Sequence, residues 1–506
     1  MGAKSAGSAR YVEVERKYDV PGATVFPSFD GISTVARVER HPSQSLDAVY
    51  FDTPGHDLAR HRITLRRRTG GPDAGWHLKL PAGADARTEV HAPLDGGAHA
   101  DGTEVPAELV DIVLAIVRDR PLVPVARIAT TRSVVKLYAA DDTALAEFAD
   151  DEVSAWAMNP DGSPGDEQQW HEWELELADG SLEGGAELLK RLGNRLLDAG
   201  AAPAGHGSKL AKVLADGLVT DAGLPEPPSD PVHRAVAEQV AELVEWDRAV
   251  RADAYDSVHQ MRVITRKIRS LLQASEDAFG LTDDAWILDE LRQLAGVLGV
   301  ARDAEVLAER YQRALDSLPP ELVRGPVRER LVDGANRRYQ AGLRRSLAAM
   351  RSPRYFRLLD ALEAMVAAEP PEPAPGEDRA PVSIDAAYKR VRKAAKTAEH
   401  AVEEQKDEAL HRIRKGAKRL RYVAAATGEP KVSERAKVIQ TLLGDHQDSV
   451  VSRTHLSQQA EIAHAAGEDT FTYGLLYQQE DDLARRSRDQ LDDALSALKR
   501  SVRKAH

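Results

Sequence analysis

The sequence predicts an α+β protein, in which a β-rich N-terminal domain precedes an all-α domain made of two related halves. Three observations support this prediction. Short β-rich stretches separated by Gly, Pro and Asp turns fill the chain up to about residue 210. From about residue 231 onward, Leu, Val and Ala recur at the three- and four-residue spacing of helices. The helical part also contains an internal repeat.

Composition limits the protein class. The 506 residues suffice for roughly two to four domains with ample cores. A net charge of -13 disfavours bulk nucleic-acid binding, although local basic clusters can still bind anions. The absence of cysteine excludes disulfides and thiolate metal sites. We expect a cytoplasmic protein, because no signal-peptide core and no run of roughly 20 apolar residues is present. The Ala/Arg/Asp/Glu-rich usage suggests a high-GC bacterial genome.

Two proline-rich segments set the expected domain boundaries. The sequence GLVTDAGLPEPPSDP predicts a linker at 216–230, between a first domain (1–215) and a helical domain (231–506). A second segment, EPPEPAPGEDRAP (369–381), divides the helical domain into repeats at about 231–368 and 382–506.

In the first domain, helices are expected at about 105–118 and 182–199. Strands are expected at seven β-rich stretches: 12–20, 63–70, 75–81, 86–94, 132–138, 144–155 and 171–177. Two of these strands carry three charged residues each at alternating positions, namely Glu13, Glu15 and Lys17, then Glu172, Glu174 and Glu176. Alternating side chains share one face of a strand. Since carboxylates seldom stack without a cation, the pattern predicts a charged lumen that holds metal ions and an anion.

Basic residues on other strands complete this predicted lumen. Arg66 and Arg68 lie at spacing two, and Lys79, Arg87, Glu89 and Arg132 add charge on further strands. Paired carboxylates suit Mg²⁺ or Mn²⁺, whereas Arg and Lys suit phosphate oxygens. Trp76 and Trp173 are expected in the core. The role of His206 is left open. Six other histidines show no ligand spacing and are interpreted as surface groups: His41, His56, His61, His77, His91 and His171.

Several motifs, in order, resemble the CYTH family of triphosphate tunnel enzymes. They are the Glu-x-Glu-x-Lys run, YFDTPGHDL (50–58), LRRR (65–68), WHLK (76–79), WELEL (173–177) and SKL (208–210). The resemblance covers about 200 residues and implies an antiparallel β-tunnel with a triphosphate lying across it. It also implies that basic residues hold the phosphates while acidic strands hold the metals.

Carried over by motif, the phosphate-binding residues are Lys17, Arg66, Arg68, Lys79, Arg87, Arg132 and Lys209. The resemblance makes Glu13, Glu15 and Lys17 catalytic, with both glutamates holding or orienting metal ions. It assigns Glu172, Glu174 and Glu176 as metal ligands without deciding which of them touches the metal. The preceding strand, ALAEFADDEV, adds Glu147 and Asp151, which share a face, with Asp150 opposite.

The internal repeat of the helical domain preserves a basic helix face. VHQMRVITRKIRSLLQ (258–273) matches LHRIRKGAKRLRYVAA (410–425), and VLGVARDAEVL (297–307) matches LLGDHQDSVVS (442–452). Four positions with equal offsets lie on one helical face in each half: His259, Arg262, Arg266 and Arg269, then His411, Arg414, Lys418 and Arg421. The simplest explanation is two helical bundles related by duplication.

Like charges at these spacings repel, so a bound polyanion would relieve the repulsion. Polyphosphate fits better than duplex DNA, because the whole chain is acidic. The segments resemble the CHAD domain over about 231–500, which implies polyphosphate binding through the histidine helices. Binding should strengthen as pH falls if the imidazoles become charged. Asp303 and Asp448 are expected to pair with helix arginines instead of touching the ligand.

The predicted function is therefore Mg²⁺- or Mn²⁺-dependent hydrolysis of a terminal phosphoanhydride, with inorganic triphosphate as the preferred substrate and long-chain polyphosphate bound by the helical domain. The same tunnel admits thiamine triphosphatase or adenylate cyclase activity. A mainly non-enzymatic polyphosphate-binding or targeting protein is the alternative from another class. Neither a membrane nor a nucleic-acid partner is expected, and association with polyphosphate granules is compatible with this prediction.

Overall fold

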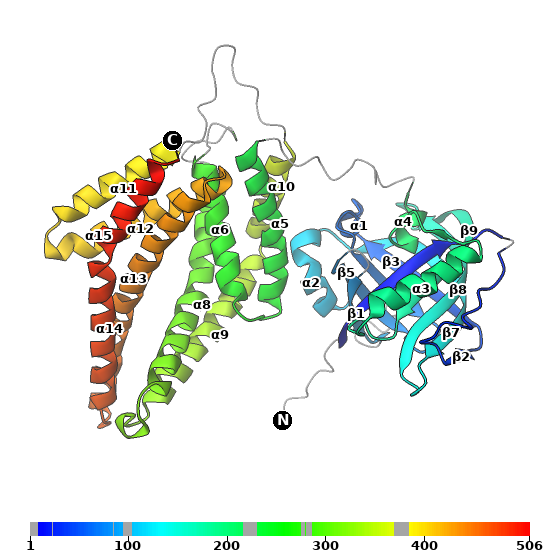
Figure 1. The fold of residues 1–506 in the computed structure, drawn as a ribbon, viewed down its shortest axis with the longest axis horizontal. Coiled ribbons are helices and arrows are strands. Elements are labelled where there is room, and N and C mark those ends of the chain that lie inside the picture. The colour runs from blue at the N-terminus through cyan, green and yellow to red at the C-terminus, as the bar shows by residue number, and fades with distance from the viewer. Residues whose placement is uncertain are drawn as a thin grey trace, which may run out of the picture. The chain divides into compact units, whose positions relative to one another are not determined.

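The chain divides into two compact units, residues 1–224 and 225–506, which are described separately. The structure, a computed structural model shown in Figure 1, describes residues 9–22, 24–83, 86–94, 104–215, 230–274, 279, 286–368 and 384–505. Most of the predicted linker (216–230) and the whole proline-rich segment (369–381) lie outside these residues. Among the described helices, none combines the length and apolar character needed to cross a membrane.

The first unit is a closed antiparallel barrel of eight strands in the order β1-β6-β5-β4-β3-β7-β8-β9, with β9 pairing back to β1. This architecture confirms the predicted antiparallel β-tunnel. The strands are β1 (Ala9–Asp19), β3 (Gln44–Asp52), β4 (Thr64–Thr69), β5 (Gly75–Pro81), β6 (Ala86–Ala92), β7 (Val123–Tyr138), β8 (Ala144–Met158) and β9 (Pro164–Leu177). Two short strands, β2 (Arg37–Arg40) and β10 (Ala202–Pro203), pair with β7 and β1.

Strand β1 closes the barrel by changing partners along its length. Its first half pairs with β6, where Glu13 lies opposite Arg87. Its second half pairs with β9, where Lys17 lies opposite Glu174. The charged residues of β1 therefore face side chains from both neighbouring strands.

The turn between β4 and β5 depends on glycine. Gly70 has a φ of 80°, and a Cβ at this position would lie 2.1 Å from the Ser45 carbonyl oxygen. A left-handed conformation with so little space excludes other residues. The Gly-Gly-Pro-Asp turn signal at 70–73 thus marks a hairpin in the structure.

Helices seal the barrel. Helix α3 (Gly185–Asp198) packs its leucines on the outer side of the barrel, in a core that contains Trp173. Helix α4 (Lys209–Val213) begins at Ser208, whose Oγ accepts a hydrogen bond from the Ala211 N–H at 3.1 Å. Its Leu210 packs with the inward-facing Ile128. Helix α4 therefore covers the lumen. Two other helices, α1 (Asp57–Arg60) and α2 (Ala107–Val117), contact each other. Trp76 and Trp173 are fully buried, as predicted.

The second unit is all-helical. Its helices are α5 (Pro231–Arg251), α6 (Ser257–Ala274), α8 (Trp286–Asp316), α9 (Gly334–Met350), α10 (Pro353–Ala367), α11 (Ile384–Glu399), α12 (Glu403–Ala426), α13 (Pro430–Ala465), α14 (Phe471–Asp489) and α15 (Leu491–Val502). A 3-10 turn (Pro320–Leu322) and a π-helical turn (Glu329–Asp333) precede α9. At the start of α5, the Asp230 carboxylate accepts hydrogen bonds from the N–H groups of Val232 and His233.

The duplication predicted from the sequence is present in three dimensions. Helix α6 packs on α8 in one half, as α12 packs on α13 in the other, and α6 contacts α12. A Cβ on Gly299 would lie 3.3 Å from the Arg262 guanidinium. The equivalent Gly444 would approach Arg414 to the same distance. In each half, a glycine thus lets an arginine lie flat across the neighbouring helix.

Candidate functional site

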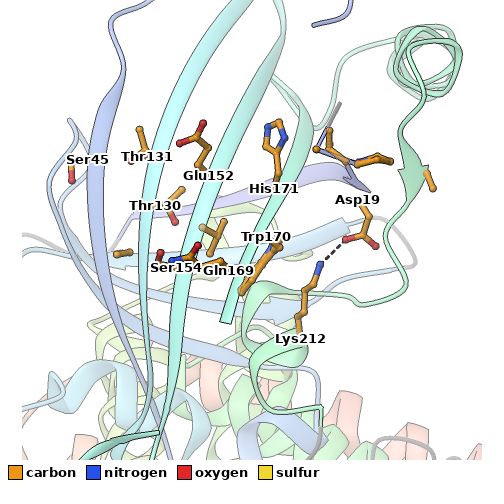
Figure 2. A pocket seen from close by; sticks show the side chains of 16 residues that line it. Asp19, Ser45, Thr130, Thr131, Glu152, Ser154, Gln169, Trp170, His171 and Lys212 are labelled. Atoms are coloured by element: carbon orange, nitrogen blue, oxygen red, sulfur yellow. Dashed lines mark hydrogen bonds and ion pairs between the residues drawn. The ribbon is translucent and has the colours of Figure 1, made fainter. Parts of the chain in front are cut away.

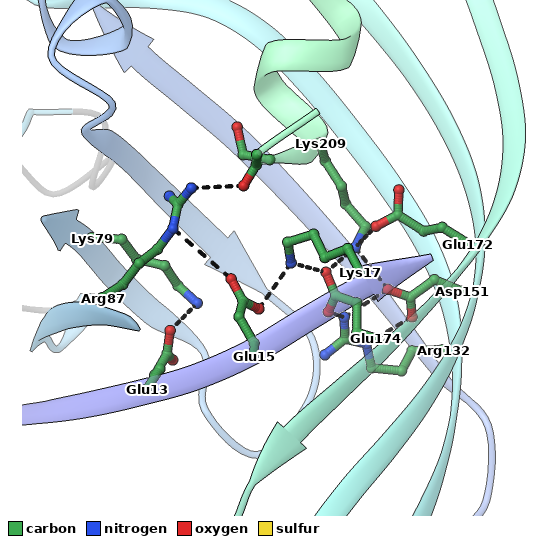
Figure 3. A network of polar contacts seen from close by, with 12 residues as sticks. Glu13, Glu15, Lys17, Lys79, Arg87, Arg132, Asp151, Glu172, Glu174 and Lys209 are labelled. Atoms are coloured by element: carbon green, nitrogen blue, oxygen red, sulfur yellow. Dashed lines mark hydrogen bonds and ion pairs between the residues drawn. The ribbon is translucent and has the colours of Figure 1, made fainter. Parts of the chain in front are cut away.

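Strand alternation and barrel closure bring the predicted charged residues together in the lumen (Figure 3). One end of the network is a cluster of three buried carboxylates, Asp151, Glu172 and Glu174. Asp151 on β8 lies opposite Glu172 on β9, and one oxygen from each of the three residues lies within 4.8 Å of the others. We call these three residues the acidic cluster.

Three basic side chains form ion pairs with the carboxylates of the acidic cluster. Lys209 Nζ lies 2.8 Å from Asp151, 2.6 Å from Glu172 and 2.8 Å from Glu174. Arg132 donates two hydrogen bonds to Asp151, at 2.8 and 2.6 Å, and a further one to Glu174. Lys17 bridges Glu174 and, at 2.8 Å, Glu15. Three basic side chains therefore balance the negative charge of the acidic cluster.

Electrostatics keep Asp151 and Glu174 ionised. Burial alone would raise the pKa of Glu174, but Lys17, Lys209 and Arg132 hold it well below the usual range. Burial likewise opposes the ionisation of Asp151, whereas Lys209 and Arg132 lower its pKa. Against its own burial, the three carboxylates raise the pKa of Lys209 well above the usual value. Ion pairs thus outweigh desolvation at this end of the lumen.

The acidic cluster fits a hard divalent cation. Its donors are all carboxylate oxygens, the ligands that Mg²⁺ and Mn²⁺ prefer. Trp170 Nε1 donates a 2.6 Å hydrogen bond to Glu172 Oε2, which fixes the orientation of that carboxylate. No residue of the cluster contributes a soft ligand such as sulfur.

A second group of charges lies along β1, β5 and β6. Lys79 bonds Glu13 and lies 3.3 Å from Glu89, which also contacts His77. Burial, followed by the hydrogen bond with Glu89, raises the pKa of Glu13 to about 8. Burial also lowers the pKa of His77 to about 4. The prediction that His77 is a surface group was wrong, because it shares the inward face of β5 with Lys79 and is 1% exposed.

Arg66 differs from the other lumen cations. Its Nη1 donates a long 3.4 Å hydrogen bond to Tyr50 Oη, and its buried Nε lacks a hydrogen-bond partner. Within the described part of the chain, Arg66 forms no ion pair with a carboxylate. Arg68, two residues further along β4, pairs instead with Asp73 of the turn. Arg66 is thus a lumen guanidinium whose donors are largely unused.

The other predicted residues lie apart from the acidic cluster. Glu147 is partly exposed and lies 3.8 Å from Lys136. Glu176 does not belong to the cluster, and burial raises its pKa to about 7. Arg87 donates a 2.6 Å hydrogen bond to the Gly207 carbonyl and lies 4.0 Å from Glu15.

Sequence reasoning missed the roles of Trp170 and Tyr50. Trp170 precedes Glu172 by two residues, so alternation already places it on the inward face of β9. Tyr50 lies opposite Arg66 in the β3–β4 pair, which only the strand register could reveal.

A pocket of about 860 Å³ borders the end of β1 and α4 (Figure 2). Asp19 lies across from Lys212 there, with Nζ and Oδ1 separated by 2.7 Å. Lys212 Nζ also lies 5.0 Å from the centre of the Trp170 ring. Thr131, Glu152 and His171 are among the other lining residues.

The helical unit gathers basic residues from both repeats. Burial, and then the positive charges of Arg266, Arg414, Arg262 and Arg421, lower the pKa of Lys418 to about 6. Burial, then nearby cations, also lowers the pKa values of His259 and His411. The cluster, which we call the basic cluster, therefore comprises these residues: His259, Arg262, Arg266, His411, Arg414, Lys418 and Arg421.

Two further details concern the predicted arginine contacts. Arg269 donates a 3.1 Å hydrogen bond to the Leu288 carbonyl. Burial, and then the positive charge of Arg292, lower its pKa, so its charged neighbours differ from those of the basic cluster and Arg269 lies apart from it. Asp303 lies 3.4 Å from Arg262, which confirms the predicted pairing. Burial raises the pKa of Asp448, while Arg414 and Arg310 oppose that rise.

Family models match both units. The CYTH domain model matches residues 12–198, and the CHAD domain model matches residues 234–457. Two uncharacterized proteins from two strains of Mycobacterium tuberculosis are each 66% identical over 511 aligned positions, covering 98% of this chain and 98% of the relative.

Solved structures show weaker likeness. PptA from Streptomyces chartreusis is 20% identical, covers 54% of this chain and 100% of its own, and has a TM-score of 0.45. The CHAD domain from the plant Ricinus communis is 24% identical, covers 53% of this chain and 91% of its own, and has a TM-score of 0.42. A Hippeastrum adenylyl cyclase candidate is described as having a dominant triphosphatase activity. It is 14% identical, covers 41% of this chain and 96% of its own, and has a TM-score of 0.25. With these TM-scores, none of the three supports a function.

Proposed function

The chain belongs to the family that joins a CYTH domain to a CHAD domain, and from that premise we propose that its tunnel hydrolyses inorganic triphosphate with Mg²⁺ or Mn²⁺. The observation that carries the proposal is the division of the lumen. An oxygen-rich acidic cluster lies at one end, and the underused Arg66 guanidinium faces the same lumen. A triphosphate that bridges metal and guanidinium would satisfy both.

Asp151, Glu172 and Glu174 would hold the metal ion, with Trp170 orienting Glu172. A bound Mg²⁺ or Mn²⁺ would supply charge neutralisation at the phosphate oxygens. Arg66 donates to phosphate oxygens along two N–H directions, and Lys79 and Lys17 add ammonium donors. Each of these groups stabilises the negative charge that develops on the leaving phosphate.

Glu13 and Glu15 lie beside the cations Lys79 and Lys17, outside the acidic cluster. We assign Glu13, whose raised pKa makes it the stronger base, to accepting the proton of the attacking water, and Glu15 to positioning that water. Within the described residues, all of these groups come from the rigid barrel and α4, which favours a fixed geometry for in-line attack.

The test is phosphate release by the full chain from tripolyphosphate, pyrophosphate, ATP and thiamine triphosphate, with Mg²⁺, Mn²⁺ or chelator. Tripolyphosphate should be the best substrate, and chelator should abolish release. The double variant Lys17→Met/Glu174→Gln should lose activity, whereas Arg127→Met, on an exposed ion pair with Asp47, should retain it. Formation of cyclic AMP and pyrophosphate from ATP would instead establish a cyclase. A preference for thiamine triphosphate would establish a thiamine triphosphatase.

We further propose that the helical unit binds long-chain polyphosphate through the basic cluster. Support comes from Lys418, whose charged form is disfavoured by burial and then by four arginines from both repeats. A polyanion would supply the missing counter-charge along the junction of α6 and α12. The proposal includes association of the protein with polyphosphate granules. It also includes independent ligand binding by the barrel and by the helical unit.

Arg414→Gln should weaken polyphosphate binding in a titration of the full chain. Arg412→Gln is the matched control, because Arg412 lies on the same helix, is exposed and pairs with Glu408. Equal affinities of the two variants would contradict the proposal. The tunnel variant Lys17→Met/Glu174→Gln should bind polyphosphate normally, and lost binding would disprove the two-site arrangement. If the chain instead bound nucleic acid with a strong salt dependence, and added polyphosphate did not compete, the helical unit would be a nucleic-acid-binding module.

A further inference from the structure

Lys209 occupies the position in the acidic cluster that a divalent cation would need. Its Nζ approaches all three carboxylates at 2.6–2.8 Å. These are the same three residues whose oxygens are spaced for a metal ion. The ammonium and the metal therefore compete for one set of ligands.

We propose that Lys209 is an exchangeable internal cation: metal binding displaces its ammonium from the acidic cluster and frees it to bind the substrate phosphates. This inference rests on the proposed function, since it concerns how the same site takes up metal and triphosphate. It assigns Lys209 two successive partners, carboxylates in the free protein and phosphate in the loaded one.

The position of Lys209 permits this exchange. It is the first residue of α4, directly after the Ser208 cap. Its backbone is fixed there, whereas its side chain has four rotatable bonds and a point charge that can be redirected. Moving the ammonium by a few ångströms needs no movement of the helix. Arg132, with two hydrogen bonds to Asp151, is held more firmly and is the poorer candidate for displacement.

Exchange has a thermodynamic consequence. In the free protein, Lys209 stabilises the ionised acidic cluster and so weakens metal affinity. A metal that displaces it leaves an unpaired ammonium in the lumen, which attracts triphosphate. Metal and triphosphate should therefore strengthen each other's binding, and the coupling must be reciprocal.

The test measures Mn²⁺ binding without substrate, by the electron paramagnetic resonance signal of free Mn²⁺. Lys209→Met should bind Mn²⁺ about tenfold tighter than the wild type, within the roughly 5- to 150-fold range typical of coupled sites. Lys209→Arg keeps a cation and should resemble the wild type. Lys190→Met, on the exposed side of α3, is the matched control and should also resemble it. Equal or weaker Mn²⁺ binding by Lys209→Met would overturn the exchange.

A measurement on the wild type covers the case in which Lys209→Met fails to fold. Brief acetylation of the full chain, followed by mass spectrometry of its peptides, reports the reactivity of each lysine. Mn²⁺ alone should raise the reactivity of Lys209 several-fold and leave Lys190 unchanged. Unchanged Lys209 reactivity under saturating Mn²⁺ would contradict the proposal. If the wild type hydrolyses triphosphate in either negative case, only the exchange is wrong; if it neither binds Mn²⁺ nor hydrolyses triphosphate, the proposed function is wrong as well.

Discussion

Replacing Arg66 with Met should lower activity while raising the stability of the barrel. A phosphate–guanidinium hydrogen bond contributes about 1.5–3 kcal/mol, so losing a two-pronged contact removes about 3–4 kcal/mol after partial compensation. At about 1.4 kcal/mol per factor of ten, kcat/KM for triphosphate should fall roughly 100- to 1000-fold.

Stability should move the other way, because the Arg66 Nε–H is buried without a partner and its bond to Tyr50 is long. Removing such a group recovers about 1 kcal/mol, which corresponds to a rise in Tm of about 2–4 °C for a unit of this size. Tryptophan fluorescence reports mainly on the barrel, which contains Trp76, Trp156, Trp170 and Trp173.

Arg127→Met is the control, since Arg127 is an exposed arginine of the same barrel whose guanidinium lies 2.8 Å from Asp47. It should retain activity within about twofold, typical of a surface change. An Arg66→Met protein that keeps its kcat/KM, or that melts well below Arg127→Met, would refute the assignment of Arg66 as a phosphate ligand.

Three further predictions concern both units. Trp170→Phe loses the hydrogen bond to Glu172 and should weaken Mn²⁺ affinity about tenfold, measured by electron paramagnetic resonance; unchanged affinity would contradict the orienting role. Gly444→Ala places a Cβ 3.3 Å from the Arg414 guanidinium and should reduce polyphosphate affinity by about 1 kcal/mol in calorimetry, with unchanged affinity indicating that Arg414 need not lie flat. Burial and neighbouring arginines depress the pKa of Lys418 to about 6, and bound phosphate favours its charged form, so binding takes up a proton and should tighten as pH falls from about 8 to about 6. Titrations at several pH values should show a flatter dependence for Lys418→Met, and an equal slope would exclude Lys418 as the group that takes up the proton.

Strand alternation was sufficient to place most of the lumen. The two-residue period put Glu13, Glu15 and Lys17 on one face, and the barrel brings Lys17 to Glu174 as that pattern required. Alternation could not decide depth along the barrel. Whether Glu172 or Glu176 joins Asp151 depends on the β8–β9 register and on the position of α4, which follow from closure and not from local sequence.

The positions of His77 and Arg269 differ from the sequence prediction for one physical reason. His77 was interpreted as exposed because it lacked ligand spacing, yet its strand position relative to Lys79 already placed it inside. The helical repeat similarly gave four equivalent positions, but Arg269 lies beyond the contact between α6 and α12 and bonds a carbonyl instead. Periodicity predicts the face of an element, whereas the partner across that face is set by tertiary packing.

The pairing of β1 with β9 also governs when the site can exist. Lys17 and Glu174 are 157 residues apart, so the N-terminal strand must wait for synthesis of β9, roughly 8–30 s at about 5–20 residues per second. During that interval the second half of β1 and the edge of β8, which both pair with β9, remain unpaired and open to aggregation or to chaperones. Such long-range closure is intrinsically slow. Lys17 and the acidic cluster therefore meet in one late step of folding, and a nascent chain lacking β9 has only Asp151 of the three carboxylates.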